Sequence, residues 1–141
     1  MMIIDANNAI LGRMATRVAK SLLIGDTVTI VNAEKAVITG NKDNIMGKYK
    51  EMADRGHRYK GPFFPKAPHR IVKRVIRGMI HWKSPKGRDA FKRLKVHIGV
   101  PEEFSELKLG NIPGASLDRS NAPRFVRVED IAKHIGWKPL M

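Results

Sequence analysis

The sequence has no cysteine, no long apolar run and few acidic residues. Without thiols the chain can form neither disulfides nor thiolate metal sites. No apolar stretch approaches the roughly 20 residues that span a bilayer, and Asp5 follows the first four residues, so we expect neither a membrane segment nor a signal peptide. Prolines at 62, 65, 68 and 85 also argue against one long basic helix on a membrane surface.

The shortage of acidic residues is concentrated in one segment. Residues 42–95 contain 17 Lys and Arg against 4 Asp and Glu, whereas the other 87 residues contain 10 against 9. Like charges at this density repel each other and oppose folding, and a polyanion that releases its counterions on binding would compensate. We therefore interpret residues 42–95 as a nucleic-acid surface on a nearly neutral scaffold.

The length of 141 residues and the 43% hydrophobic content predict a single domain, residues 1–141, with a C-terminal loop and helix over 101–141. Runs of β-branched and apolar residues predict strands at 2–5, 28–31, 36–39, 96–100 and 125–128. Apolar spacings of three and four predict helices at 11–24, 42–51 with Asn41 as N-cap, from 68 onward, from 89 onward and at 131–136. The order strand, helix, strand is typical of an α/β fold.

The helix after Pro68 has a divided surface. One arc of its helical wheel holds Ile71, Val72, Val75, Ile76, Met79 and Ile80. Another arc, about 100° wide, holds Arg70, Lys73, Arg74, Arg77 and His81. Such a row is most often a solvated surface, but here no Asp or Glu at four-residue spacing neutralises it. We predict that the row contacts phosphates.

Two further basic stretches flank this helix. Residues 52–67 are predicted to be an irregular loop that drapes over a phosphate backbone. Its Tyr59, Phe63 and Phe64 could stack on bases, but we favour the interpretation that the two phenylalanines anchor the loop to the core. In the second stretch Asp89 is expected to cap a helix with Phe91 and Leu94 inward. Its outward residues would be Lys92, Arg93 and Lys95.

Catalytic and metal-binding patterns are weak. His57, His69 and His81 are twelve residues apart, which aligns them on no single helix or strand, and no carboxylate cluster or cysteine supports them. The His and Lys residues suitable for acid–base chemistry are scattered through basic loops. No GxGxxG or Walker sequence occurs, and the TGNK turn at 39–42 would more readily hold a backbone phosphate than a free nucleotide. We predict no enzyme activity, metal, cofactor or small-molecule substrate.

Several segments resemble the family of the thirteenth large-subunit ribosomal protein. They are IDA at 4–6, LGRMA at 11–15, IVNAEKA at 30–36, TGNK at 39–42, GPFFPKAPHRI at 61–71, RGM at 77–79 and FKRLKV at 91–96. The similarity runs from about residue 3 to 105 and is weaker in the last 36 residues. The turn at 22–26 lacks the insertion of bacterial members, and the chain ends at Met141 without the basic extension of eukaryotic ones, which suggests an archaeal-type member.

The resemblance implies a three-layer α/β/α domain around a four-stranded parallel sheet. It also implies a structural role in the cytoplasm: binding large-subunit rRNA, assisting assembly and contacting neighbouring ribosomal proteins. The alternatives are a free-standing RNA-binding regulator and an RNA-modifying enzyme. Lys73 stands where relatives often have a large aromatic residue.

Charge and helical spacing select the individual RNA-binding candidates, which contact the backbone rather than read bases. They are Arg13, Lys42, Lys48, Lys50, Arg55, Arg58, Lys60, Lys66, His69, Arg70, Lys73, Arg74, Arg77, His81, Lys83, Lys86, Arg88, Lys92, Arg93 and Lys95.

Overall fold

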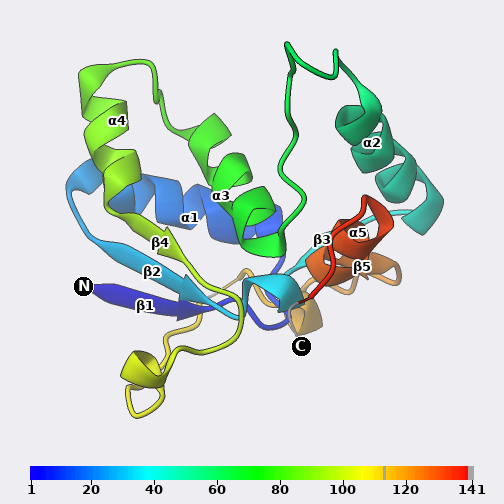
Figure 1. Ribbon diagram of the computed structural model, residues 1–141. Helices are drawn as coiled ribbons and strands as arrows, with labels where there is room; N and C mark the ends of the chain where they lie inside the picture. The colour runs from blue at the N-terminus through cyan, green and yellow to red at the C-terminus, as the bar shows by residue number, and fades with distance from the viewer. Residues whose placement is uncertain (113, 140–141) are drawn as a thin grey trace.

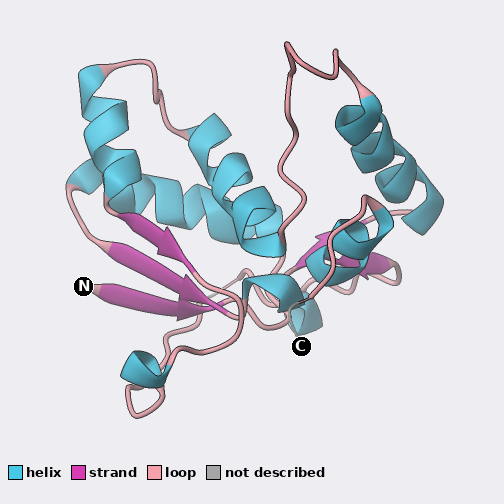
Figure 2. Ribbon diagram, in the orientation of Figure 1, coloured by secondary structure: helices cyan, strands magenta, loops and turns pink. Residues whose placement is uncertain are grey.

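Helices and short strands alternate along the chain in the computed structural model, which describes residues 1–112 and 114–139 (Figures 1 and 2). The elements are β1 (Met2–Asp5), α1 (Leu11–Ile24), β2 (Val28–Val31), β3 (Val37–Thr39), α2 (Lys42–Asp54), α3 (Pro68–Met79), α4 (Pro85–Lys92), β4 (Leu94–Val96), β5 (Phe125–Arg127) and α5 (Val128–His134). This order confirms the predicted α/β class. None of the described helices is long and apolar enough to cross a membrane.

The strands form two small sheets. Parallel strands in the order β1-β2-β4 make the first, and β3 pairs with β5 in an antiparallel ladder in the second. The expected four-stranded parallel sheet is therefore wrong. Among the described residues, one bridge, between Ile4 and Gly110, lies along the free edge of β1. The strand β3 instead hydrogen-bonds beside the turn that precedes α1, where the Val37 N–H donates to the Ala9 carbonyl at 2.9 Å.

The helices are divided between these two sheets (Figure 1). α1, α3 and α4 cover one side of the parallel sheet, whereas α2 and α5 lie beside the antiparallel pair. The parallel sheet is thus not the centre of the expected three-layer sandwich. Because β5 and α5 come from the C-terminal residues, this end of the chain completes the scaffold under α2.

The second basic helix begins earlier than predicted. Its N-cap is Ser84, whose Oγ accepts the Gly87 N–H at 3.1 Å, and Pro85 occupies the first turn. Asp89 therefore lies inside α4 rather than at its cap. Gly87 is required because a Cβ there would overlap the backbone carbonyl of His81. The strand that follows, β4, also begins earlier in the sequence than predicted, at Leu94 instead of residue 96.

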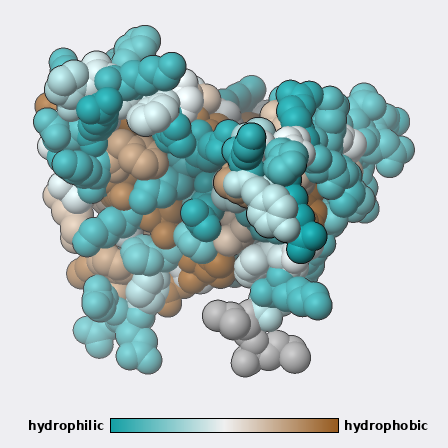
Figure 3. All heavy atoms as spheres, turned by 45° about the horizontal axis from the view of Figure 1, so that its top comes forward, coloured by the Kyte–Doolittle hydropathy of each residue, from teal (hydrophilic) through white to brown (hydrophobic). Residues whose placement is uncertain are grey.

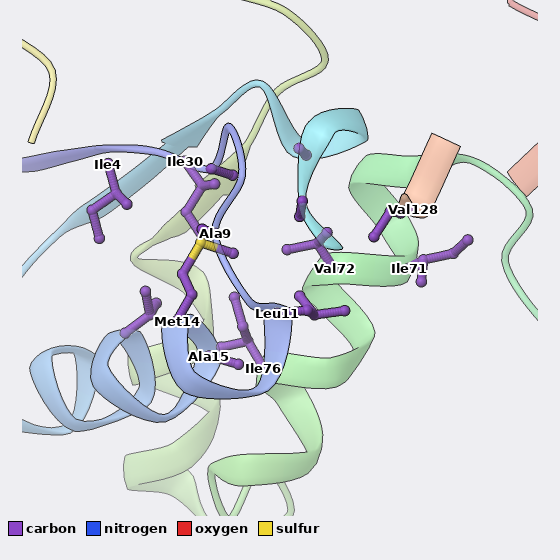
Figure 4. Packing of buried hydrophobic residues seen from close by; sticks show 14 of the residues in the cluster. Ile4, Ala9, Leu11, Met14, Ala15, Ile30, Ile71, Val72, Ile76 and Val128 are labelled. Carbon is purple, nitrogen blue, oxygen red and sulfur yellow. The ribbon is translucent and has the colours of Figure 1, made fainter. Parts of the chain in front are cut away.

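A single apolar core joins α1, α3 and both sheets (Figure 4). On α1 the predicted residues Met14, Val18 and Leu22 are completely buried, and Met14 points toward Ile30 of β2 (Figure 4). The α1 helix ends at Gly25, whose φ of 123° favours glycine and whose N–H returns to the last turn. The core therefore fixes the side of α3 that faces outward.

Candidate nucleic-acid interface

The two sides of α3 are sorted as its sequence predicts. Ile71, Val72 and Ile76 are no more than 1% exposed and pack against α1 and the core. The opposite side presents four cations, which we call the α3 row: Arg70 and Arg74 are exposed, and Lys73 and Arg77 are half-buried. Met79 departs from the expected pattern. It is 42% exposed because it ends the helix beyond the packed surface.

Three members of the α3 row stack on aromatic rings. The distances from the charged group to the ring centroid are 5.1 Å for Lys73 and Phe91, 5.2 Å for Arg74 and Phe64, and 3.8 Å for Arg77 and Trp82. Attraction between a cation and the face of a ring holds these long side chains in place without neutralising them. A ligand that binds the row therefore loses less free energy to side-chain ordering.

Few of the predicted cations are paired with acids. Across the described residues, the predicted cations in ion pairs are Lys50, 3.4 Å from Asp54, and Arg55, 2.7 Å from Glu51. Both pairs join exposed side chains four residues apart on α2 or at its end, and such pairs are worth about 0.3–0.5 kcal/mol. A polyanion could displace these carboxylates at little cost.

Arg93 does not point outward, contrary to the prediction. Its Nη2 donates to the Leu22 carbonyl at 2.6 Å, and the side chain is half-buried. The last carbonyls of a helix lack partners within the helix and attract cations, which explains the contact with α1. Arg93 therefore fastens the start of β4 to α1 and is withdrawn from the candidate interface.

Arg13 is exposed on α1, and its Nη1 donates to the Gly114 carbonyl at 3.1 Å. The guanidinium thus contacts the C-terminal loop. Only part of its hydrogen-bonding capacity is used there, since a guanidinium has five N–H groups. Its role in RNA binding remains a prediction.

His69, near the start of α3, is half-buried. Burial lowers the pKa of its imidazole, and the positive charges of Arg70, His97 and Lys73 lower it further. Its buried Nδ1 has no hydrogen-bond partner within the described part of the chain. His69 is therefore a neutral group beside the α3 row rather than an additional cation.

The remaining candidates lie on exposed surface. They are Lys42, Lys48 and Lys50 of α2; Arg55, Arg58, Lys60 and Lys66 of the following loop; His81 and Lys83 after α3; Lys86, Arg88 and Lys92 of α4; and Lys95 of β4. Together with the α3 row we call these residues the cationic face. Figure 3 shows hydrophilic side chains over α4 on one side and α2 on the other, with apolar surface between them.

Folding brings separate parts of the cationic face together. Arg74 lines a hollow of about 430 Å³ between α2 and α3 with Lys48 and Arg55. Lys138, which sequence reasoning missed, joins Arg58 in another hollow beside the loop. Lys48 and Arg55 precede Arg74 by 26 and 19 residues in the sequence, so only tertiary packing makes them neighbours.

The two loop phenylalanines have different environments. Phe64 is half-buried, with its ring centroid 6.0 Å from that of Tyr49, so its predicted role as an anchor is confirmed. Phe63 is 68% exposed, so the anchor interpretation is wrong for this residue. Tyr59 is also exposed, at 78%. Sequence reasoning missed Trp82, although its position between His81 and Lys83 in the basic segment was an available signal.

An α/β scaffold that carries many exposed cations, few of them paired with acids, is typical of nucleic-acid-binding proteins. Comparison with known families is more specific: the profile of the family described as Ribosomal protein L13 matches residues 1–103. The chain belongs to the ribosomal protein L13 family. It is accordingly a structural constituent of the ribosome and not an enzyme.

The similarity to individual relatives extends over almost the whole chain. "Large ribosomal subunit protein uL13" of Archaeoglobus fulgidus is 46% identical over 137 residues, covering 96% of this chain and 88% of the relative. The proteins of the same name from Methanosarcina barkeri and Methanococcoides burtonii are 45% and 43% identical, each covering 98% of this chain and 99% of the relative. These sources confirm the predicted archaeal type, and the alignments reach into the C-terminal region where the sequence motifs were weaker.

Proposed function

We propose that this protein stabilises rRNA of the large ribosomal subunit through phosphate contacts of its cationic face, and that it assists subunit assembly by doing so. The relatives that align over nearly its full length are named as large-subunit proteins. As a ribosomal protein of archaeal type it works in the cytoplasm. The observation that supports the RNA contact most directly is the α3 row, whose four cations have no acidic partner within 4 Å among the described residues.

The geometry of α3 suits a phosphate backbone. Arg70 and Arg77 are seven residues apart, which corresponds to about 10 Å along a helix at 1.5 Å per residue. Four cations over this length create a strong local positive potential, and binding releases the counterions condensed on the RNA. Because the buried side of the helix packs into the core, the row is presented on a rigid support.

Contacts with neighbouring large-subunit proteins form a second part of this proposal. Exposed apolar side chains at Ile98, Val100 and Leu107 accompany exposed acidic residues at 102, 103 and 106, outside the cationic face. Acidic charge beside apolar surface matches a basic protein better than it matches RNA. We expect this segment to face a basic protein of the large subunit.

Photo-crosslinking in purified large subunits tests both parts. A photoreactive amino acid at Lys73 should crosslink to rRNA, whereas the same group at Leu107, which is 48% exposed, should crosslink to protein. Crosslinks to protein alone from Lys73 would contradict the phosphate contact. Sedimentation in high salt distinguishes a subunit constituent, which stays with the large subunit, from a free-standing regulator, which leaves it.

A further inference from the structure

A third hollow, a groove over the α3 row, combines all four cations of the row with aromatic side chains. Its volume is about 650 Å³, within the roughly 300–1,000 Å³ of sites that hold small molecules. The four cations of the α3 row, Phe63 and Pro65 from the loop, and Trp82 and Phe91 from the α3–α4 region form its lining. No Asp or Glu occurs among these described lining residues.

The packing of the fold does not explain why two of the aromatic rings are accessible to solvent. Phe63 is 68% exposed and Trp82 37% exposed, although the neighbouring Phe64 of the same loop is packed against Tyr49. Leaving large apolar rings in water is unfavourable, and such surface marks an interaction site. Phosphate contacts alone would not require it, since lysine and arginine suffice for them.

We propose that this groove binds an unpaired RNA nucleotide, with its base stacked on the exposed aromatic rings and its phosphate held by the α3 row. The inference rests on the proposed RNA-binding function and specifies one site within it. Aromatic rings and arginine planes are the groups on which proteins stack splayed-out bases, and cations beside them bind the backbone. Arg77, stacked on Trp82 at 3.8 Å, lies where both kinds of contact meet.

Other occupants fit the groove less well. An intact double helix presents phosphates and sugars at its surface and keeps its base faces stacked inside, so it leaves the rings without a partner. An apolar protein segment would bury four cations without compensation, which is costly. An acidic peptide would match the charge but supplies no flat ring for Phe63 and Trp82.

Two ligands that differ only in their bases test the proposal. The ligands are a short single-stranded RNA oligonucleotide and an abasic ribose-phosphate oligomer of the same length. The full-length chain has two tryptophans, so a Trp137→Phe variant makes Trp82 the only indole reporter. We expect the RNA to quench and shift the Trp82 fluorescence, and the abasic oligomer to bind more weakly with little change in emission.

Paired variants locate the effect in the groove. Phe63→Ala should weaken binding of the RNA about 5- to 150-fold, the range for loss of one stacked base, and leave binding of the abasic oligomer unchanged. Phe125→Ala is the matched control, because Phe125 is an exposed phenylalanine outside the groove. It should change the affinity for either ligand less than twofold.

Three results would overturn the base-binding site. The first two are equal affinity for both oligomers and an equal effect of the two alanine variants on RNA binding. The third is that polyglutamate displaces the RNA and that Phe63→Ala weakens the binding of polyglutamate as much as that of the RNA. In each case salt-sensitive binding of structured rRNA would still support the proposed function. Absence of binding to any RNA would instead reject the proposed function itself.

Discussion

Removing the charges of the α3 row should change the salt dependence of rRNA binding more than the stability of the fold. In the triple variant Arg70→Gln, Arg74→Gln and Arg77→Gln, up to three phosphate contacts are lost. Each contact contributes about 0.7–0.9 to the slope of log affinity against log salt concentration, so the slope should become shallower by about 2–3. If other kinds of contact held the protein to the rRNA, the triple variant would keep the salt slope of the unmodified protein.

The cost to folding follows from the stacking contacts. Arg74 and Arg77 lie over Phe64 and Trp82, and an exposed contact of this kind is worth about 0.5–1 kcal/mol. Arg70 lines the groove but stacks on no ring among the described residues. The triple variant should therefore lose about 1–2 kcal/mol, which leaves a domain of ordinary stability folded.

Filter binding to a large-subunit rRNA fragment at several salt concentrations measures the slope, and urea unfolding measures the stability. The control is Lys20→Gln, Lys35→Gln and Lys108→Gln, which removes the same charge from exposed positions outside the cationic face. Its slope should match that of the unmodified protein. Equal changes of the salt slope in both triple variants would mean that net charge, not the α3 row, drives binding. Unfolding of the arginine variant would refute the assignment of a buried and an exposed side to α3.

Three further predictions concern stability. Ile76→Ala, at a fully buried position, should lower the free energy of unfolding by about 2–5 kcal/mol in urea titrations, whereas Ile24→Ala, at a position 73% exposed, should change it by less than about 0.5 kcal/mol. Gly87→Ala should lower the melting temperature because the added Cβ overlaps a backbone carbonyl. Gly78→Ala is the control, since Gly78 has open space around it in α3, and it should stabilise the protein by about 0.5–1 kcal/mol. Equal melting temperatures of the two variants would contradict the close packing at Gly87. The pKa of His69 is lower in the folded protein than its usual value of 6.5. As the pH falls, the imidazole is therefore protonated in the unfolded chain before it is protonated in the folded one, so stability should decrease below about pH 6.5. His69→Gln should flatten this pH dependence of stability, and an unchanged pH profile would contradict the prediction.

The sequence predicted those features that depend on local spacing. The division of α3 into a buried side and a cationic side follows from its 3.6-residue period and needs no knowledge of the fold. The same holds for α1, whose end is marked by Gly25, and for β1 and β2 around it. The start of α4 was misplaced because Ser84 and Asp89 are both good caps, and the competition was decided by the contact of Gly87 with the preceding turn.

Pairing between distant residues lay beyond local spacing. Whether β3 joins the parallel sheet or pairs with β5 depends on which backbone edge reaches it, and a three-residue strand contains no signal for that choice. Likewise Arg93 and Lys95 look alike in sequence, yet one caps α1 and the other is exposed.

Charge and periodicity are properties of the chain, so the amino-acid sequence alone specifies a strongly basic middle segment on a nearly neutral α/β scaffold. Packing between distant residues specifies which cations face outward, which aromatic rings stay accessible beside them, and how the strands divide into two sheets. These features depend on contacts between residues far apart in sequence, where packing and unpaired backbone groups select one arrangement among many that local preferences allow.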